Sequence, residues 1–168
     1  VLVLAARRLE ECIRAEDTLA RLGGDEFGIL LEDVSAPWGV NLVAEKIVEG
    51  MRAPFLVDGK ALVLGVSIGI SLFPFDGNDP GTMLRNADTA MYHAKGAGRN
   101  NHQFYTARMN EAAGERAVDR VQHLGRGEAG EHLDAQRLGL LAHPLDPSAQ
   151  ADDVVAVVVE ALRHQPVG

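Results

Sequence analysis

Residues 21–27 read Arg-Leu-Gly-Gly-Asp-Glu-Phe, and an apolar run, residues 27–31, follows directly. A strand-like segment, two glycines and a second apolar run predict a β-hairpin whose second strand is buried. Glycine lets a backbone approach a phosphate closely, and the carboxylates of Asp25 and Glu26 are ligands that Mg²⁺ prefers. The stretch therefore predicts a metal–nucleotide site on a hairpin. Taken alone, it is equally compatible with the commoner structure, a plain turn with a solvated acidic edge.

The composition limits the kinds of function. Among 168 residues, 16 Lys and Arg stand against 24 Asp and Glu, which gives a formal net charge of −8. Such acidity argues against a nucleic-acid-binding surface, yet it allows a single nucleotide held by a cation. The one cysteine, Cys12, excludes a disulfide within the chain and fits a reducing compartment, so we expect a cytoplasmic protein. We find no apolar stretch of the length of a membrane-spanning segment.

The apolar periodicity predicts an alternation of helices and strands. Helices are expected over 1–14, 37–51 and 80–96, and strands over 18–22, 27–32, 55–57, 61–73 and 103–105. For the last helix, Asp79 is the expected N-cap and Pro80 the first helical residue. This order predicts an α+β fold with an antiparallel-rich sheet flanked by helices. We place the end of the compact domain at residue 108, because the pattern weakens in 109–168.

Three blocks of sequence carry a resemblance to a known family. The first, residues 14–27, contains Arg-x-x-Asp and Gly-Gly-Asp-Glu-Phe; the second, 67–77, begins Ser-Ile-Gly-Ile-Ser; the third, 86–100, runs from Asn-Ala-Asp to Gly-Arg-Asn. In this order they resemble the GGDEF family, the diguanylate cyclases, over nearly all of residues 1–108. The resemblance implies the nucleotidyl cyclase or ferredoxin-like fold of that family, with the first strand and helix missing.

The resemblance also implies an activity. Enzymes of this family join two GTP molecules into cyclic di-GMP with Mg²⁺ or Mn²⁺, and they work as homodimers. Asp25 would be a metal ligand, and Glu26 a second metal contact or a proton acceptor. Neighbouring side chains of a straight strand point to opposite faces, so these two acids share a site only if Gly23 and Gly24 turn the chain. Both glycines would also lie against the substrate.

Two further pairs of residues have an implied role and a simpler alternative. The resemblance makes Lys95 and Arg99 contacts to GTP phosphates, whereas cations near a helix C-terminus can also merely offset its dipole. It makes Arg14 and Asp17 an inhibitory site for the product cyclic di-GMP, whereas the alternative is a surface salt bridge of little energetic value. Lys46 is a further candidate cation for the inhibitory site.

The chain also departs from the family pattern. The family's domain begins earlier, with a strand that bears another metal-binding Asp, so we expect the sheet to lack its central strand and to leave unpaired backbone edges. We therefore expect this chain alone neither to make cyclic di-GMP at an appreciable rate nor to fold robustly. The alternatives are a non-catalytic regulatory module that binds GTP or cyclic di-GMP, and a fragment that binds neither.

The segment 109–168 is expected to contain a linker helix followed by a poorly ordered remnant. Residues 109–113 resemble the linker that precedes an EAL phosphodiesterase domain in many relatives, and residues 160–163, Glu-Ala-Leu-Arg, faintly resemble the EAL motif itself. In that motif the Glu would be a metal ligand. We interpret the segment as a truncated or frame-shifted EAL-like remnant.

Overall fold

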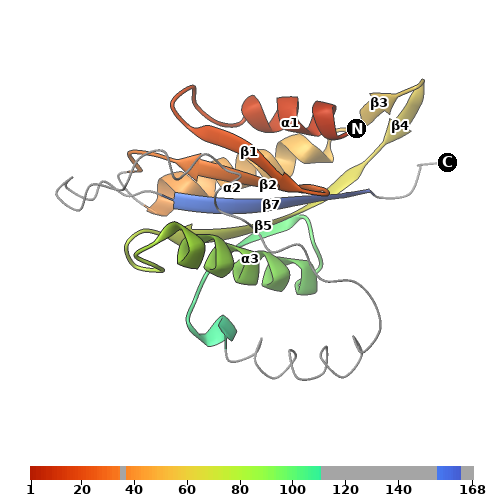
Figure 1. The fold of residues 1–168 in the computed structure, drawn as a ribbon. Coiled ribbons are helices and arrows are strands. Elements are labelled where there is room, and N and C mark those ends of the chain that lie inside the picture. Colours follow the sequence, from red (N-terminus) through yellow and green to blue (C-terminus); the bar gives the residue numbers. More distant parts are fainter. Residues whose placement is uncertain (35–36, 111–154, 164–168) are drawn as a thin grey trace.

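The structure, a computed structural model, describes residues 1–34, 37–110 and 155–163 (Figure 1). In chain order the elements are α1 (Leu2–Glu10), β1 (Thr18–Gly23), β2 (Glu26–Leu31), α2 (Pro37–Arg52), β3 (Phe55–Val57), β4 (Lys60–Leu62), β5 (Leu64–Leu72), α3 (Pro80–Gly96), β6 (Asn101–Phe104) and β7 (Val155–Arg163). The main sheet has the order β1-β2-β7-β5-β6, and β3 and β4 form a separate hairpin. Only the β5–β6 pair is parallel among these strands. The predicted α+β fold with an antiparallel-rich sheet is confirmed.

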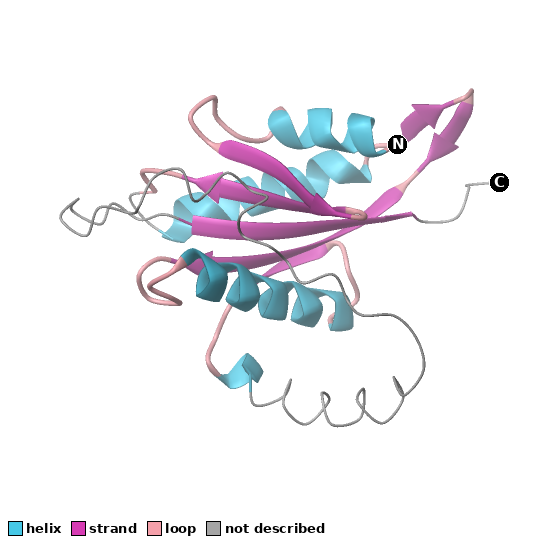
Figure 2. Cartoon of the chain, in the orientation of Figure 1, coloured by secondary structure: helices cyan, strands magenta, loops and turns pink. Residues whose placement is uncertain are grey.

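The helices cover both faces of the sheet. Figures 1 and 2 show α1 and α2 on one face and α3 on the other. Side chains alternate between the two faces along a strand, and in β2 Phe27, Ile29 and Leu31 are the buried ones, on the side of α1 and α2. Burial of each such side chain contributes about 1.5–3 kcal/mol. This core fixes the register of β2 and so the position of the turn before it.

The central strand of the sheet is β7. It pairs antiparallel with β2 on one side and with β5 on the other. Val155, Val157 and Val159 lie in the core below α1 and α2, and Val158 packs against α3. Because both faces of β7 are covered, residues 155–159 form a continuous apolar run rather than an alternating one.

Two expectations are therefore wrong. The sheet does not lack a central strand between β2 and β5, and residues 155–163 are not a poorly ordered remnant. The physical reason is that this nine-residue strand, apolar over residues 155–159, satisfies two rows of backbone donors and acceptors that would otherwise be unpaired. The expected linker helix and most of the range 109–168 lie outside the described residues, so the domain boundary at 108 stays a prediction.

Helix α3 begins as the sequence predicts and lies unusually close to the sheet. The Asp79 carboxylate accepts from the backbone N–H of Thr82 at 2.9 Å, and Pro80 is the first helical residue. At Gly69 of β5, an added Cβ would lie 1.9 Å from the carbonyl oxygen of Ala87.

Among the described residues, none of the helices combines the length and the apolar character that a membrane span needs.

One predicted strand is divided in the structure. Residues 61–73 were expected to form a single strand, but β4 ends at Leu62 and β5 begins at Leu64. The break has a clear cause, because β4 pairs with β3 in the small hairpin while β5 pairs with β6 and β7 in the main sheet.

Candidate functional site

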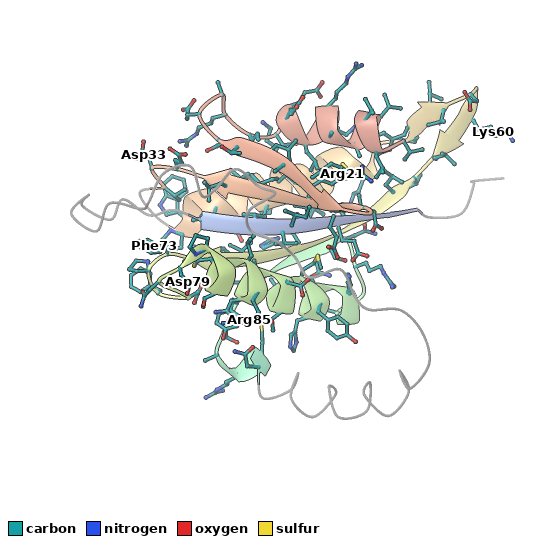
Figure 3. All side chains as sticks on the ribbon, in the orientation of Figure 1. Arg21, Asp33, Lys60, Phe73, Asp79 and Arg85 are labelled. Atoms are coloured by element: carbon teal, nitrogen blue, oxygen red, sulfur yellow. The ribbon has the colours of Figure 1, made fainter. Side chains whose placement is uncertain are left out.

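The turn between β1 and β2 is built from its two glycines and one arginine. Gly24 has φ +48°, a conformation that favours glycine, whereas a Cβ at Gly23 would meet nothing within 4 Å. Arg21, labelled in Figure 3, donates from Nε and Nη2 to the carbonyl oxygen of Gly24 at 3.1 and 2.7 Å. The turn is therefore held by its own backbone and by Arg21, and the surface above Gly23 is open.

The acidic pair follows this turn and lies against α3. Burial raises the pKa of Glu26, and the charges of Asp88 and Asp25 raise it further, while Lys95 opposes the shift. The carbonyl of Asp25 accepts from the N–H of Ala161 at 3.1 Å, which ties the turn to β7. Asp25 and Asp88 of α3 are therefore both close enough to act on Glu26, and a shared site of Asp25 and Glu26 stays a prediction.

Lys95 forms an ion pair that the sequence did not reveal. Its Nζ contacts the carboxylate of Glu160 on β7, and the two side chains are only 23% and 10% exposed. Glu160 lies directly opposite Glu26 of β2 and Ser67 of β5 in the strand register. Glu26, Glu160 and Ser67 therefore form a row across three neighbouring strands, and Lys95 of α3 contacts the middle one, Glu160.

Arg99 lies just beyond α3 and is exposed. Its backbone has φ +59°, and its N–H donates to the carbonyl of Ala94 at 3.2 Å. Asn101 donates from its side-chain amide to the carbonyl oxygens of Ala94 and Arg99 at 2.9 and 3.0 Å. The backbone of Arg99 thus closes the C-terminal end of α3, which leaves its guanidinium in solvent. This placement is compatible with either predicted role, phosphate contact or helix-dipole partner.

The acidic side chains of this site suit a metal ion that binds together with a phosphate ligand better than a permanently bound metal ion. No group of three or more His, Cys, Asp or Glu side chains in the described part of the chain is placed to hold a metal ion. Asp25 and Glu26 supply two carboxylates, and the neighbouring Glu160 is already paired with Lys95. Mg²⁺ typically binds one or two carboxylates together with substrate phosphates, and the two acids fit that arrangement.

The second predicted site lies at the far end of β2. Asp17 accepts from the backbone N–H of Arg14 at 2.8 Å and from that of Glu32 at 3.4 Å. Glu32 follows β2 and Glu26 begins it, so the two predicted sites are about 20 Å apart. Asp17 is bonded to the backbone of Arg14, which makes it a loop-fixing group rather than half of the salt bridge considered from the sequence.

A groove of about 210 Å³ adjoins Arg14 and Asp17. Apolar side chains of β2, of α2 and of the loop between them line it together with the acids Asp17, Glu32 and Asp33. Trp38, which also lines it, is 68% exposed. Lys46 does not contribute to this groove, because its Nζ donates to the carbonyls of Glu11 and Cys12 at the end of α1. The groove therefore offers one cation, Arg14, and one large aromatic surface.

Sequence reasoning missed four residues near the site: Arg21, Ser67, Asp88 and Glu160. Arg21 lies within the motif block, and its spacing of three from Gly24 is a local signal that could have been noticed. Asp88 lies seven residues before Lys95, so both are on one face of α3. Glu160 could not have been found, because nothing local in the sequence says that residues 155–163 pair beside residue 26.

The chain is similar to known proteins over most of its length. A family model described as "Diguanylate cyclase, GGDEF domain" matches residues 1–101. The chain is 42% identical over 115 residues to the bifunctional diguanylate cyclase/cyclic di-GMP phosphodiesterase MucR of Pseudomonas aeruginosa, a match that covers 68% of this chain and 17% of MucR. It is 38% identical over 112 residues to the diguanylate cyclase TpbB of the same species, covering 66% of this chain and 25% of TpbB. The chain thus spans a quarter or less of the length of these relatives.

Two solved structures have a similar fold. An EAL/GGDEF domain protein from M. capsulatus matches with a TM-score of 0.60 and 47% identity, over 62% of this chain and 68% of that one. The GGDEF domain of TpbB, also called YfiN, matches with a TM-score of 0.65 and 33% identity, over 67% of this chain and 66% of that one.

Proposed function

Because this chain belongs to the GGDEF family of diguanylate cyclase domains, we propose that it binds GTP at the Gly-Gly turn and serves the condensation of two GTP molecules into cyclic di-GMP. The observation that carries the proposal is the turn itself, where half-buried Glu26 lies close to both Asp25 and Lys95. A protein that consumes GTP belongs in the cytoplasm. Two GTP molecules must meet, so the active form is a homodimer with one GTP in each protomer.

The residues of the chain take the following roles in this proposal. Gly23 and Gly24 let the backbone run beside the triphosphate, and the open space above Gly23 supports this. Lys95 and Arg99 compensate phosphate charge. Glu26 accepts the proton of the ribose 3′-hydroxyl, whose oxygen forms a bond to the α-phosphorus of the other GTP as the bond to pyrophosphate breaks. Its raised pKa suits a proton acceptor, because a base works best with a pKa near the working pH.

The family generally uses a divalent metal ion. We propose that Asp25 holds Mg²⁺ or Mn²⁺ together with phosphate oxygens of GTP, which leaves Glu26 as the proton acceptor. When bound, the ion neutralises charge on the leaving oxygens.

Calorimetric titration with GTP and Mg²⁺ tests the binding step. Asp25→Asn removes one charged ligand without changing the size of the side chain, and we expect it to weaken binding at least tenfold. Glu49→Gln makes the same change of charge at an exposed pair with Arg52 on α2, and we expect no effect. Equal binding by the Asp25→Asn variant would show that GTP does not bind at this turn.

Turnover is the second test. We expect the 168 residues alone to release little cyclic di-GMP, because Lys95 is already engaged by Glu160. Incubation with GTP and Mg²⁺, followed by chromatography of the products, measures this directly. Several turnovers per chain would refute the expected inactivity while supporting the proposed reaction.

The groove beside Arg14 favours a second candidate function, a regulatory module that binds cyclic di-GMP. Arginine can donate two hydrogen bonds to a guanine edge, and exposed Trp38 offers a surface on which a base can stack. We expect Arg14→Ala to abolish binding of cyclic di-GMP, and Arg52→Ala, which removes an exposed arginine of α2, to leave it unchanged. Binding of cyclic di-GMP without any binding of GTP would favour the regulatory module over the cyclase.

A further inference from the structure

The central strand β7 supplies a carboxylate to the position where a phosphate would be expected. Glu160 is buried to 8% exposure, and its carboxylate contacts Nζ of Lys95. Lys95 is also the cation that the proposed function assigns to GTP phosphate. A carboxylate and a phosphate oxygen compete for the same donor, because both form charge-assisted hydrogen bonds with an ammonium group.

The charges around Lys95 explain why this pair is stable. Glu160 and Glu26 lie directly opposite each other on neighbouring strands, an arrangement that is unfavourable for like charges. Lys95 acts on Glu26 and contacts Glu160, so one ammonium compensates two carboxylates. With Asp25 and Asp88 also acting on Glu26, the surroundings are acidic, and an approaching phosphate is repelled unless a cation comes with it.

The strand that carries Glu160 is attached directly to the Gly-Gly turn. The N–H of Ala161 donates to the carbonyl of Asp25 at 3.1 Å, one residue from Glu160. On the other side, Glu160 faces Ser67, whose Oγ is buried without a hydrogen-bond partner among the described residues. Both neighbouring strands fix the backbone of Glu160, and burial together with the contact to Lys95 holds its carboxylate.

We propose that Glu160 is an internal anion that occupies the phosphate-binding position of Lys95 and so holds the site in a self-inhibited state. This inference rests on the proposed function, which assigns Lys95 to phosphate. Nucleotide phosphate binds only after Lys95 exchanges Glu160 for a phosphate oxygen. Removal of the charge on Glu160 then tightens phosphate binding and reduces its dependence on a divalent cation.

The test measures binding of inorganic tripolyphosphate to the full chain in EDTA, at low ionic strength, by calorimetry. Glu160→Gln keeps the length of the side chain and an oxygen for Lys95 but carries no charge, so the pairing of β7 is retained. We expect it to bind tripolyphosphate at least tenfold more tightly than the unchanged chain. Glu49→Gln makes the same change of net charge at an exposed site, and we expect an effect below twofold. Lys95→Gln added to Glu160→Gln should abolish the gain.

The outcomes separate this inference from the proposed function. Equal or weaker tripolyphosphate binding by Glu160→Gln, at an unchanged melting temperature, overturns the inference. If GTP with Mg²⁺ still binds and Asp25→Asn weakens it, the proposed function stands without the inference. Tighter tripolyphosphate binding with no binding of GTP supports the internal anion and refutes the cyclase. Should Glu160→Gln fail to unfold cooperatively, Glu160→Asp replaces it, because it moves the charge one methylene away from Lys95. A gain of about threefold is then expected, and no gain overturns the inference.

Discussion

Substitution of Gly69 by alanine should be among the most damaging single changes in the chain. Gly69 lies on β5 beneath α3, and a Cβ there would lie 1.9 Å from the carbonyl oxygen of Ala87 and 2.2 Å from the backbone nitrogen of Met91. Both atoms belong to helix backbone, which cannot rotate aside as a side chain can. The helix must therefore withdraw by at least about 1 Å, a gap that forfeits a quarter to a half of the dispersion energy of each contact it opens.

The expected cost follows from this displacement. Overpacking of a tight core typically costs about 1–3 kcal/mol and occasionally more. Alanine also restricts the unfolded chain more than glycine does, which offsets about 0.4–1 kcal/mol of this loss of stability. We expect a net loss of about 2 kcal/mol or more, the upper end of these ranges, because backbone atoms block the site on two sides. For a chain of this size, about 2 kcal/mol corresponds to a fall in melting temperature of roughly 4–8 °C.

Urea and thermal unfolding followed by circular dichroism measure the effect. The matched control is Gly65→Ala, on the same strand, where the nearest atom to a new Cβ is Asn100 Oδ1 at an ordinary 3.5 Å. We expect that variant to stay within about 1 kcal/mol of the unchanged chain. If Gly69→Ala were as stable as Gly65→Ala, that result would refute the close approach of α3 to β5 at Gly69.

Three further predictions test other parts of the fold. Asp79→Ala removes the N-cap of α3, so the melting temperature should fall, whereas Asp79→Asn should retain most of it because asparagine also caps well. The hydrogen bonds to Thr82 lower the pKa of Asp79. The contribution of Asp79 to stability is therefore present above its pKa in the unfolded chain and is lost as pH falls through its pKa in the folded chain. Melting curves from pH 7 to pH 2 should show this loss. Burial raises the pKa of Asp76, although the N–H of Leu72 opposes the shift. Stability from this group is therefore greatest below the unfolded pKa and declines as pH rises through the folded pKa, and Asp76→Asn should flatten that decline in melting temperatures measured between pH 3 and pH 7. Burial also raises the pKa of the Cys12 thiol. The reaction of this thiol with a chromogenic disulfide at pH 8 should therefore be at least tenfold slower in the native chain than in urea. Equal rates would place Cys12 at the surface.

The sequence was sufficient for those parts of the fold that local patterns determine. The apolar stripes of α2 and α3, the N-cap at Asp79 and the apolar run of β2 are each local patterns of a few residues. The acidic pair and its turn were equally local, because Gly24 must adopt a left-handed conformation for Glu26 to begin β2 where it does.

The position of β7 could not be derived in the same way. The apolar run that contains Val157 and Val159 predicts burial, but a short apolar run does not say whether it is helix or strand, nor which strands it joins. Its partners, β2 and β5, are separated from it by many residues, so pairing depends on the whole sheet. For the same reason Glu160 was assigned to a faint EAL motif, whereas the structure places it against Lys95.

The central place of β7 also sets the order of events during synthesis of the chain. β6 leaves the ribosome about 60 residues before β7 is complete, which at ordinary elongation rates is about 3–12 s. During that interval β2 and β5 each have an unpaired edge, and such edges pair readily with other chains. The time between translation of β6 and completion of β7 is therefore the period in which newly made chains are most prone to aggregate.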